Sequence, residues 1–186
     1  MNKKLKILLT SSAFFTLAGG LFGPIYAIFV ENWVKGGSIL LAGNAYAAFS
    51  ISAGMLLFFV SRWEDKIKHK EKLVVFGWVL SCLGYLGYIT VSHTQEPIHL
   101  ILVQALFGIG TAIGNPAYDS IYSENLDRGK FASEWGLWES MTFIIGALAA
   151  VTGGYLATIW NFQALFIIMF FVSLIGLSIS ILLFKN

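Results

Sequence analysis

Charged residues are scarce in this chain: Asp, Glu, Lys and Arg make up 12% of its 186 residues, while 57% are hydrophobic. A soluble domain carries roughly 25% charged residues, so this scarcity excludes an ordinary soluble protein and indicates a membrane protein. The formal net charge of +2 is too small to indicate a nucleic-acid partner.

Cysteine is almost absent as well. The single cysteine, Cys82, lies inside an apolar run and excludes an intrachain disulfide, so we expect it to serve packing. The histidines lack zinc-ligand spacing, and neither H-E-x-x-H nor G-x-S-x-G occurs. We therefore expect no metal, no cofactor and no enzymatic activity.

Long apolar stretches, in contrast, fill the chain. About 20 mainly apolar residues cross a bilayer core of roughly 30 Å, and six stretches reach that length. They cover residues 7–30, 38–61, 73–91, 98–120, 135–159 and 162–184. The connections leave no room for a soluble domain, so we expect residues 1–186 to form one all-α domain of six transmembrane helices.

The polar residues 62–72 determine the orientation in the membrane. They read R-W-E-D-K-I-K-H-K-E-K and hold five of the twelve Lys and Arg residues. Because Lys and Arg near span ends stay on the cytoplasmic side, this loop and both termini face the cytoplasm. Eleven basic residues then lie inside and Lys35 alone lies outside. We expect a multi-pass protein of the cell membrane, surrounded by lipid bilayer.

Two short segments indicate an internal repeat. The first span contains G-P-I-Y from Gly23 and the fourth contains N-P-A-Y from Asn115, each with its proline about 17 or 18 residues after the span begins. Since three spans is an odd number, the second three would be inverted relative to the first. Paired interruptions in inverted halves point to a transport site between them. Coincidence and ordinary helix kinks are the alternative explanation.

Small residues recur one helical turn apart, a spacing that lets helix backbones approach closely where lipid supplies no hydrophobic drive. The pairs are Gly110 and Gly114, Ala149 and Gly153, and Ala150 and Gly154.

Around residues 61–70 the chain resembles the major facilitator superfamily. The family's signature between its second and third helices is a small residue, three positions, an Asp, a basic residue and further basic residues. Here Asp65 and Lys66 stand in register behind Ser61, although Ser61 and Lys68 replace usual glycines. Residues 127–130 and the glycine-rich fifth span are also similar to the family. The resemblance implies one six-helix half of the family's fold, a 3+3 inverted-repeat bundle.

Family members usually have two such halves, with the substrate path between them. The resemblance therefore implies a secondary transporter of a small solute, acting as a homodimer or with a second half-transporter. The alternative is a membrane interaction or regulatory subunit without transport, such as a truncated transporter half.

The resemblance also implies a cytoplasmic gate in the basic loop, formed by Asp65, Lys66, Lys68 and Lys70. In the family, basic residues of this loop hold an acidic residue at the cytoplasmic end of the fourth helix, and the aspartate faces the other half. The candidates for that contact here are Lys66, His69 or Lys70 with Asp119, Glu124 or Asp127.

Two carboxylates, Asp119 and Glu139, lie inside the spans. Each is 21 residues from the outer end of its span, hence roughly 32 Å from the outer face at 1.5 Å per residue. Ionisable groups within spans are candidates for function. Because neighbouring carboxylates repel, one could hold a proton and serve a proton-coupled step. Alternatively, the basic loop caps both.

Four polar residues are candidates for the substrate path: Asn44, Tyr46, Gln104 and Asn115. The alternative is that they hydrogen-bond to helix backbones or neighbouring spans, as most buried polar groups do.

Overall fold

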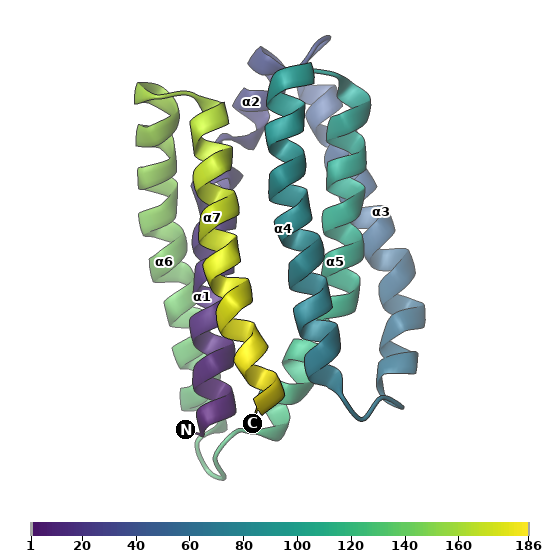
Figure 1. Ribbon diagram of the computed structural model, residues 1–186, viewed down its shortest axis with the longest axis vertical. Coiled ribbons are helices and arrows are strands. Elements are labelled where there is room, and N and C mark those ends of the chain that lie inside the picture. The colour runs from purple at the N-terminus through teal and green to yellow at the C-terminus, as the bar shows by residue number, and fades with distance from the viewer. Residues whose placement is uncertain (1, 186) are drawn as a thin grey trace.

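A computed structural model describes residues 2–185, which form helices joined by short turns without any strand (Figure 1). The elements are α1 (Lys3–Phe22), η1 (Gly23–Ile25), α2 (Tyr26–Trp33), α3 (Ile39–Glu64), α4 (Lys70–Thr94), α5 (Pro97–Glu124), α6 (Phe131–Ile159), α7 (Phe162–Ser180) and η2 (Ile181–Lys185). The first span is α1, η1 and α2 together, and α7 continues into η2. Six helical units are long and apolar enough to cross a membrane, which confirms the predicted fold class.

The helices extend beyond the predicted spans. α3 continues to Glu64 and α4 begins at Lys70, so the predicted polar loop 62–72 is reduced to residues 65–69. Hydropathy marks only the part of a helix that can lie in hydrocarbon. Glu, Lys and Arg are good helix formers, so each helix continues past that part, and the helix ends lie beyond the predicted span ends.

Three helices begin at a capping side chain. Asn2 before α1, Ser38 before α3 and Asn161 before α7 each accept a hydrogen bond from the backbone N–H three residues later, at 2.9–3.1 Å. Such caps satisfy one of the free N–H groups of the first turn. Between α4 and α5 the chain reverses through Gln95, whose φ of 57° is left-handed, and Pro97 then opens α5.

Both ends of the chain lie at the same end of the bundle, the lower end in Figure 1. The turns 65–69 and 125–130 lie there too, and an ion pair of 2.9 Å between Lys4 and Glu71 joins the starts of α1 and α4. We call this the basic end, because eleven of the twelve Lys and Arg residues belong to it. Which side of the membrane it faces stays a prediction.

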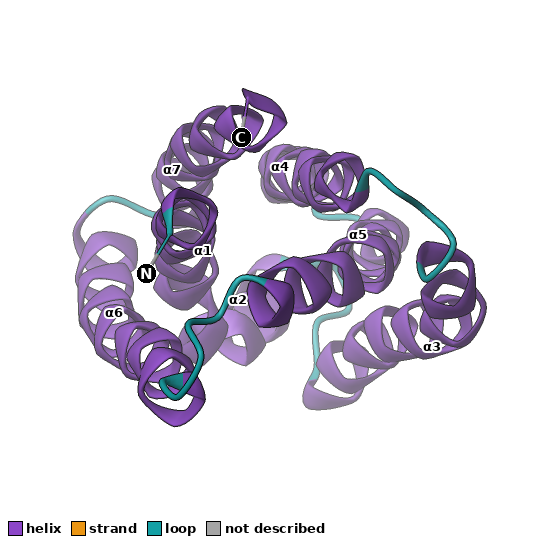
Figure 2. Cartoon of the chain, turned by 90° about the horizontal axis from the view of Figure 1, so that it is seen from below, coloured by secondary structure: helices purple, strands orange, loops and turns teal. Residues whose placement is uncertain are grey.

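The packing of the helices repeats within the bundle. α1 packs against α6 and α7, α5 packs against α3 and α4, and α4 packs against α7, whereas α1 and α5 barely touch (Figure 2). Exchanging α1 with α5, α3 with α6 and α4 with α7 leaves these neighbours unchanged. A pseudo-two-fold axis between inverted three-helix halves produces this pattern, in agreement with the predicted inverted repeat.

Close crossings bring helix backbones into direct contact, among them those at Gly153 and at Gly77. A Cβ atom at Gly153 of α6 would lie 1.7 Å from the carbonyl oxygen of Leu21 in α1. A Cβ atom at Gly77 of α4 would lie 2.6 Å from the Cα of Gly114 in α5. Neither position has room for a side chain, so glycine makes these close approaches possible.

The packing predicted from small residues is confirmed for two pairs. Gly110 and Gly114 lie against α4, and Ala149 and Gly153 lie against α1. A Cβ atom at Gly154 would meet no described atom within 4 Å. Gly154 therefore makes no close crossing, and the prediction was wrong there.

Candidate functional site

One pocket, of about 290 Å³, lies in the half of the bundle away from the basic end, and we call it the outer pocket. Tyr46 comes seven residues after α3 begins at Ile39, and Gln104 seven after α5 begins at Pro97. At a rise of 1.5 Å per residue, the pocket lies about 10 Å from the end of the bundle at which α3 and α5 begin, which is opposite the basic end. Its lining consists of Gly19, Phe22, Gly23, Tyr26, Tyr46, Phe49, Tyr85, Tyr88, Gln104, Phe107 and Met169.

The outer pocket is aromatic and contains no charged side chain. Seven of its lining residues carry aromatic rings. Among the described residues, the hydroxyls of Tyr85 and Tyr88 make no hydrogen bond, although these side chains are only 7% and 5% exposed. The Tyr26 hydroxyl is buried near the Gln104 amide but has no described partner at hydrogen-bond distance. These polar groups are thus available to a solute, since leaving them unpaired costs free energy.

The break in the first span shapes this pocket. Pro24 has no backbone N–H, so the α-helical hydrogen bonds are interrupted and residues 23–25 form a 3₁₀ turn. Gly19 and Gly23 carry no side chain, which leaves space beside them. The ring of Phe22 is held edge-on against Tyr88 with centroids 5.0 Å apart, a favourable aromatic geometry.

The matching proline in the second half behaves differently. Pro116 lies inside a continuous α5, whereas Pro24 separates α1 from α2. The predicted pair of interruptions is therefore wrong for α5.

A second pocket, of about 330 Å³, lies nearer the basic end, and we call it the inner pocket. Asp119 is its only charged lining residue, five residues before α5 ends at Glu124 and hence about 8 Å from that end. The Asp119 carboxylate makes no hydrogen bond or ion pair with the described residues. The full lining is Ser12, Phe15, Thr16, Trp78, Asn115, Tyr118, Asp119, Trp138 and Thr142.

The two pockets follow one another along α1 and α5. Thr16 lines the inner pocket and Gly19, one helical turn further along α1, lines the outer pocket. On α5, Asn115 belongs to the inner pocket and Gln104 to the outer one. Because α1 and α5 barely touch, the space between them is where both pockets form.

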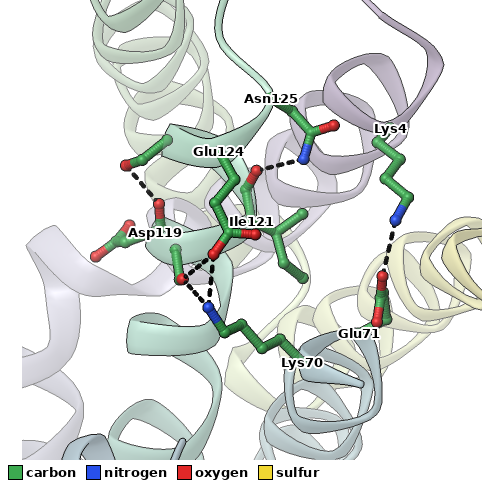
Figure 3. A network of polar contacts seen from close by, with 9 residues as sticks. Lys4, Lys70, Glu71, Asp119, Ile121, Glu124 and Asn125 are labelled. Atoms are coloured by element: carbon green, nitrogen blue, oxygen red, sulfur yellow. Dashed lines mark hydrogen bonds and ion pairs between the residues drawn. The ribbon is translucent and has the colours of Figure 1, made fainter. Parts of the chain in front are cut away.

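A cluster of polar side chains ties the helices together at the basic end (Figure 3). Lys70 Nζ lies 2.6 Å from Glu124 Oε1 and 2.5 Å from Ser120 Oγ, which joins α4 to α5. Among the contacts considered for the basic loop, the pair formed is therefore Lys70 with Glu124. Asp119 lies outside this pair, so a clasp on Asp119 stays a prediction.

The other residues of the predicted gate point away from the bundle. Asp65, Lys66 and Lys68 are exposed, and their side chains make no hydrogen bond or ion pair with the described residues. The structure thus separates Lys70, which is bound to α5, from three exposed residues.

Some of the remaining residues predicted to have a functional role line a pocket, and the others lie on the surface. Tyr46 and Gln104 line the outer pocket and Asn115 the inner one, whereas Asn44 is exposed on α3 and lines neither. Glu139 is exposed on α6 outside both pockets and makes no ion pair or hydrogen bond with Asp119. Among residues 2–185, no group of three His, Cys, Asp or Glu side chains is placed to hold a metal.

Sequence reasoning missed four residues that the structure singles out. Tyr85 and Tyr88 lie three residues apart within a span and so share a helix face, a signal that could have marked them. Tyr26 follows the G-P-I motif directly. Glu64 is 3% exposed, and neither carboxylate oxygen has a hydrogen-bond partner among the described residues. Nothing in the sequence distinguishes it from the exposed Asp65.

Six apolar helices among the described residues, basic residues gathered at one end and two pockets along α1 and α5 are the features of a multi-pass membrane protein. The chain belongs to the major facilitator superfamily, whose family model matches residues 8–186. It is similar to a Bacillus subtilis (strain 168) protein described as "Uncharacterized MFS-type transporter YitZ", at 25% identity over 162 residues. That alignment covers 84% of this chain and 93% of the relative, so the two are of similar length. The predicted family is confirmed.

Proposed function

We propose that this chain is a half-size secondary transporter that encloses a path for a small solute together with a second six-helix unit. The unit is a second copy of the chain or another half-transporter, and both termini of this chain lie in the cytoplasm. Family membership supports transport. The observation that carries the proposal is the succession of two pockets along α1 and α5, one towards each end of the bundle. Alternating access requires such a site between the two sides of the membrane.

The distribution of exposed polar side chains supports a second unit. In the middle of α4 and α7 the exposed side chains are apolar, as contact with lipid requires: Phe76, Leu83, Leu86, Ile167, Phe171 and Ile175. α3, α5 and α6 expose polar and charged side chains within their spans: Asn44, Tyr46, Asn115, Asp119 and Glu139. Polar groups at membrane depth face protein or water rather than lipid. The second unit therefore covers the face made by α3, α5 and α6.

The exposed residues of the basic loop complete the proposal. Asp65, Lys66 and Lys68 are free to contact the second unit when the basic end closes, while Lys70 holds the loop to α5 through Glu124. Asp119 and Glu139 are the candidates for a proton-coupled step. If Asp119→Asn and Glu139→Gln both leave transport and its pH dependence unchanged, proton coupling at these residues is wrong.

Thiol labelling tests alternating access without knowledge of the solute. Cys82, the only cysteine in the sequence, is buried, so Cys82→Ala gives a background without thiols. In that background Tyr46→Cys reports on the outer pocket and Asn115→Cys on the inner one. Tyr155→Cys, at an exposed position outside both pockets, is the control.

We expect a membrane-impermeant maleimide to reach Tyr46→Cys from outside and Asn115→Cys from the cytoplasmic side. In the double variant, a bulky maleimide on Tyr46→Cys should hold the outer side open and slow the labelling of Asn115→Cys. Prior labelling of Tyr155→Cys should leave that rate unchanged. Labelling of the two pockets at independent rates would instead indicate a non-transporting membrane subunit.

A further inference from the structure

We propose that the two pockets bind an organic cation with one or two aromatic rings. The inference names the class of solute for the proposed function. Movement of this cation from one pocket to the other depends on that proposed function. Its binding is a separate property that can be measured without transport.

The outer pocket favours a cation through its rings. The faces of aromatic rings attract a cation electrostatically, most strongly when water is excluded, and rings of this kind recognise quaternary ammonium groups. Seven aromatic side chains line this pocket, from α1, α2, α3, α4 and α5. The hydroxyl oxygens of Tyr85 and Tyr88 add the negative ends of polar groups.

The inner pocket supplies a negative charge. Asp119 is the only charged residue in either lining, and its carboxylate is unpaired among the described residues. A carboxylate at this depth costs free energy unless a cation or water compensates it. A cationic solute passing from the rings to Asp119 would be stabilised in both pockets.

An anion finds no matching charge in either pocket. No Lys, Arg or His lines them. Lys70, at the basic end of α4, is occupied by Glu124 and Ser120. An uncharged solute would suit the rings but would leave Asp119 without a partner.

The size of the pockets limits the solute. Volumes of about 290 and 330 Å³ lie at the lower end of the roughly 300–1,000 Å³ typical of small-molecule sites. One or two fused rings with a short ammonium side chain fit this space.

Three indoles that differ in charge test the inference directly. N,N,N-trimethyltryptamine is a permanent cation, indole-3-ethanol is uncharged and indole-3-acetate is an anion at pH 7. Calorimetric titration of the full chain in detergent should show saturable binding of the cation, at least tenfold tighter than the alcohol. The acetate should bind more weakly still. Equal binding of the alcohol, tighter binding of the acetate, or no binding by any of the three would overturn the inference.

Two pairs of variants locate the binding. Asp119→Asn should lower the preference for the cation over the alcohol at least fivefold, whereas Glu31→Gln, an exposed carboxylate outside both pockets, should not change it. Tyr46→Leu should weaken cation binding severalfold. Tyr155→Leu, which is 64% exposed where Tyr46 is 60% exposed, should leave it unchanged. An unchanged preference in Asp119→Asn with a folded protein would contradict the assignment.

Exchange of radiolabelled N,N,N-trimethyltryptamine across liposomes separates this inference from the proposed function. Binding in detergent without exchange would uphold the cation site and reject transport. Exchange of a different solute without binding of the indole cation would uphold transport and reject the cation site.

Discussion

Compared with the first three spans, the last three repeat the packing but not the chemistry. α5 crosses α3 and α4 as α1 crosses α6 and α7. In the pocket linings, however, α1 and η1 contribute glycine, aromatic and hydroxyl groups, whereas α5 contributes, besides aromatic rings, the amides of Gln104 and Asn115 and the carboxylate of Asp119. The first half also has a broken central helix and the second half a continuous one.

This difference shows that the helix packing, which we call the frame of the molecule, follows the two-fold repeat, whereas the side chains that line the pockets do not. The frame depends on close helix crossings that the pseudo-two-fold axis exchanges, so substitutions at the α1–α6 crossing and at the α3–α5 crossing should have equal effects on stability. The amides and the carboxylate of the pocket linings all belong to α5, so substitutions in α5 should affect binding more than substitutions in α1.

The largest effect is expected where a side chain would meet backbone. A Cβ atom at Gly153 would lie 1.7 Å from the Leu21 carbonyl oxygen, and one at Gly108 would lie 2.4 Å from the Phe49 carbonyl oxygen. Overpacking typically costs 1–3 kcal/mol, and because backbone cannot rotate away we expect about 3 kcal/mol for Gly153→Ala and for Gly108→Ala. Thermal unfolding in detergent should show a fall of several degrees for both variants.

Gly154→Ala is the matched control for this pair, since its Cβ atom would meet nothing within 4 Å among the described residues. Its melting temperature should equal or slightly exceed that of the unchanged protein, because alanine favours a helix interior over glycine by roughly 0.5–1 kcal/mol. A large loss at Gly153 with none at Gly108 would show that the α1–α6 and α3–α5 crossings are not equivalent.

A smaller effect is expected at Glu64, which has no counterpart in the second half. α3 ends at Glu64, whereas the equivalent α6 ends at the apolar Ile159. The Glu64 carboxylate is buried and lacks hydrogen-bond partners among the described residues, and burial raises its pKa to about 7. The fraction that stays charged at neutral pH costs more free energy than a neutral amide would. We expect Glu64→Gln to stabilise the protein by about 1–3 kcal/mol, measured as a higher melting temperature.

Asp65→Asn is the comparison for Glu64→Gln, because Asp65 is the adjacent, exposed residue and acts on Glu64 only through its negative charge. It should raise the melting temperature less than Glu64→Gln does. A fall in stability in Glu64→Gln would show that the carboxylate has a partner essential to the fold.

The smallest effects on stability are expected at two ion pairs, one at the basic end of the bundle and one at the opposite end. Lys70 is 21% exposed and binds both Glu124 and Ser120, so Lys70→Met should cost about 1 kcal/mol, the upper range for an accessible pair. Lys35 and Glu96, 60% and 45% exposed, form a simple surface pair at the other end. Lys35→Met should therefore produce no measurable change in melting temperature at neutral pH.

The stabilisation by the ion pair between Lys35 and Glu96 should also depend on pH in a defined direction. The hydrogen bond from Lys35 and its positive charge lower the pKa of Glu96. A lowered pKa in the folded state means that the contribution of the pair is present above the ordinary glutamate pKa of about 4.3 and is lost as the pH falls below it. Any stability difference between Lys35→Met and the unchanged protein should accordingly vanish in acid. A difference that grew in acid would contradict this sign.

Much of the fold could be predicted because membrane insertion depends on local sequence. Apolar length revealed each span, and the positions of Lys and Arg grouped the basic turns at one end, which the ion pair of Lys4 with Glu71 bears out. The exact helix ends could not be predicted, since the charged residues before Asp65 and after His69 are helical although they are not apolar.

Less of the candidate site could be predicted, because pockets depend on contacts between distant helices. Gln104 and Asn115 were found since polar residues in spans are rare, but no sequence signal tells that they line different pockets. The partner of Lys70 was narrowed to three acidic residues, and only the packing of α4 on α5 selects Glu124. The burial of Glu64 is likewise a product of tertiary packing alone.

The mass of the complex extracted in mild detergent or lipid nanodiscs tests the central claim most directly, when combined with exchange of N,N,N-trimethyltryptamine by the same preparation. The account predicts two six-helix units in one particle, so for a homodimer twice the 20.5 kDa of this chain. A particle containing a single 20.5 kDa chain that exchanges solute unaided would contradict it.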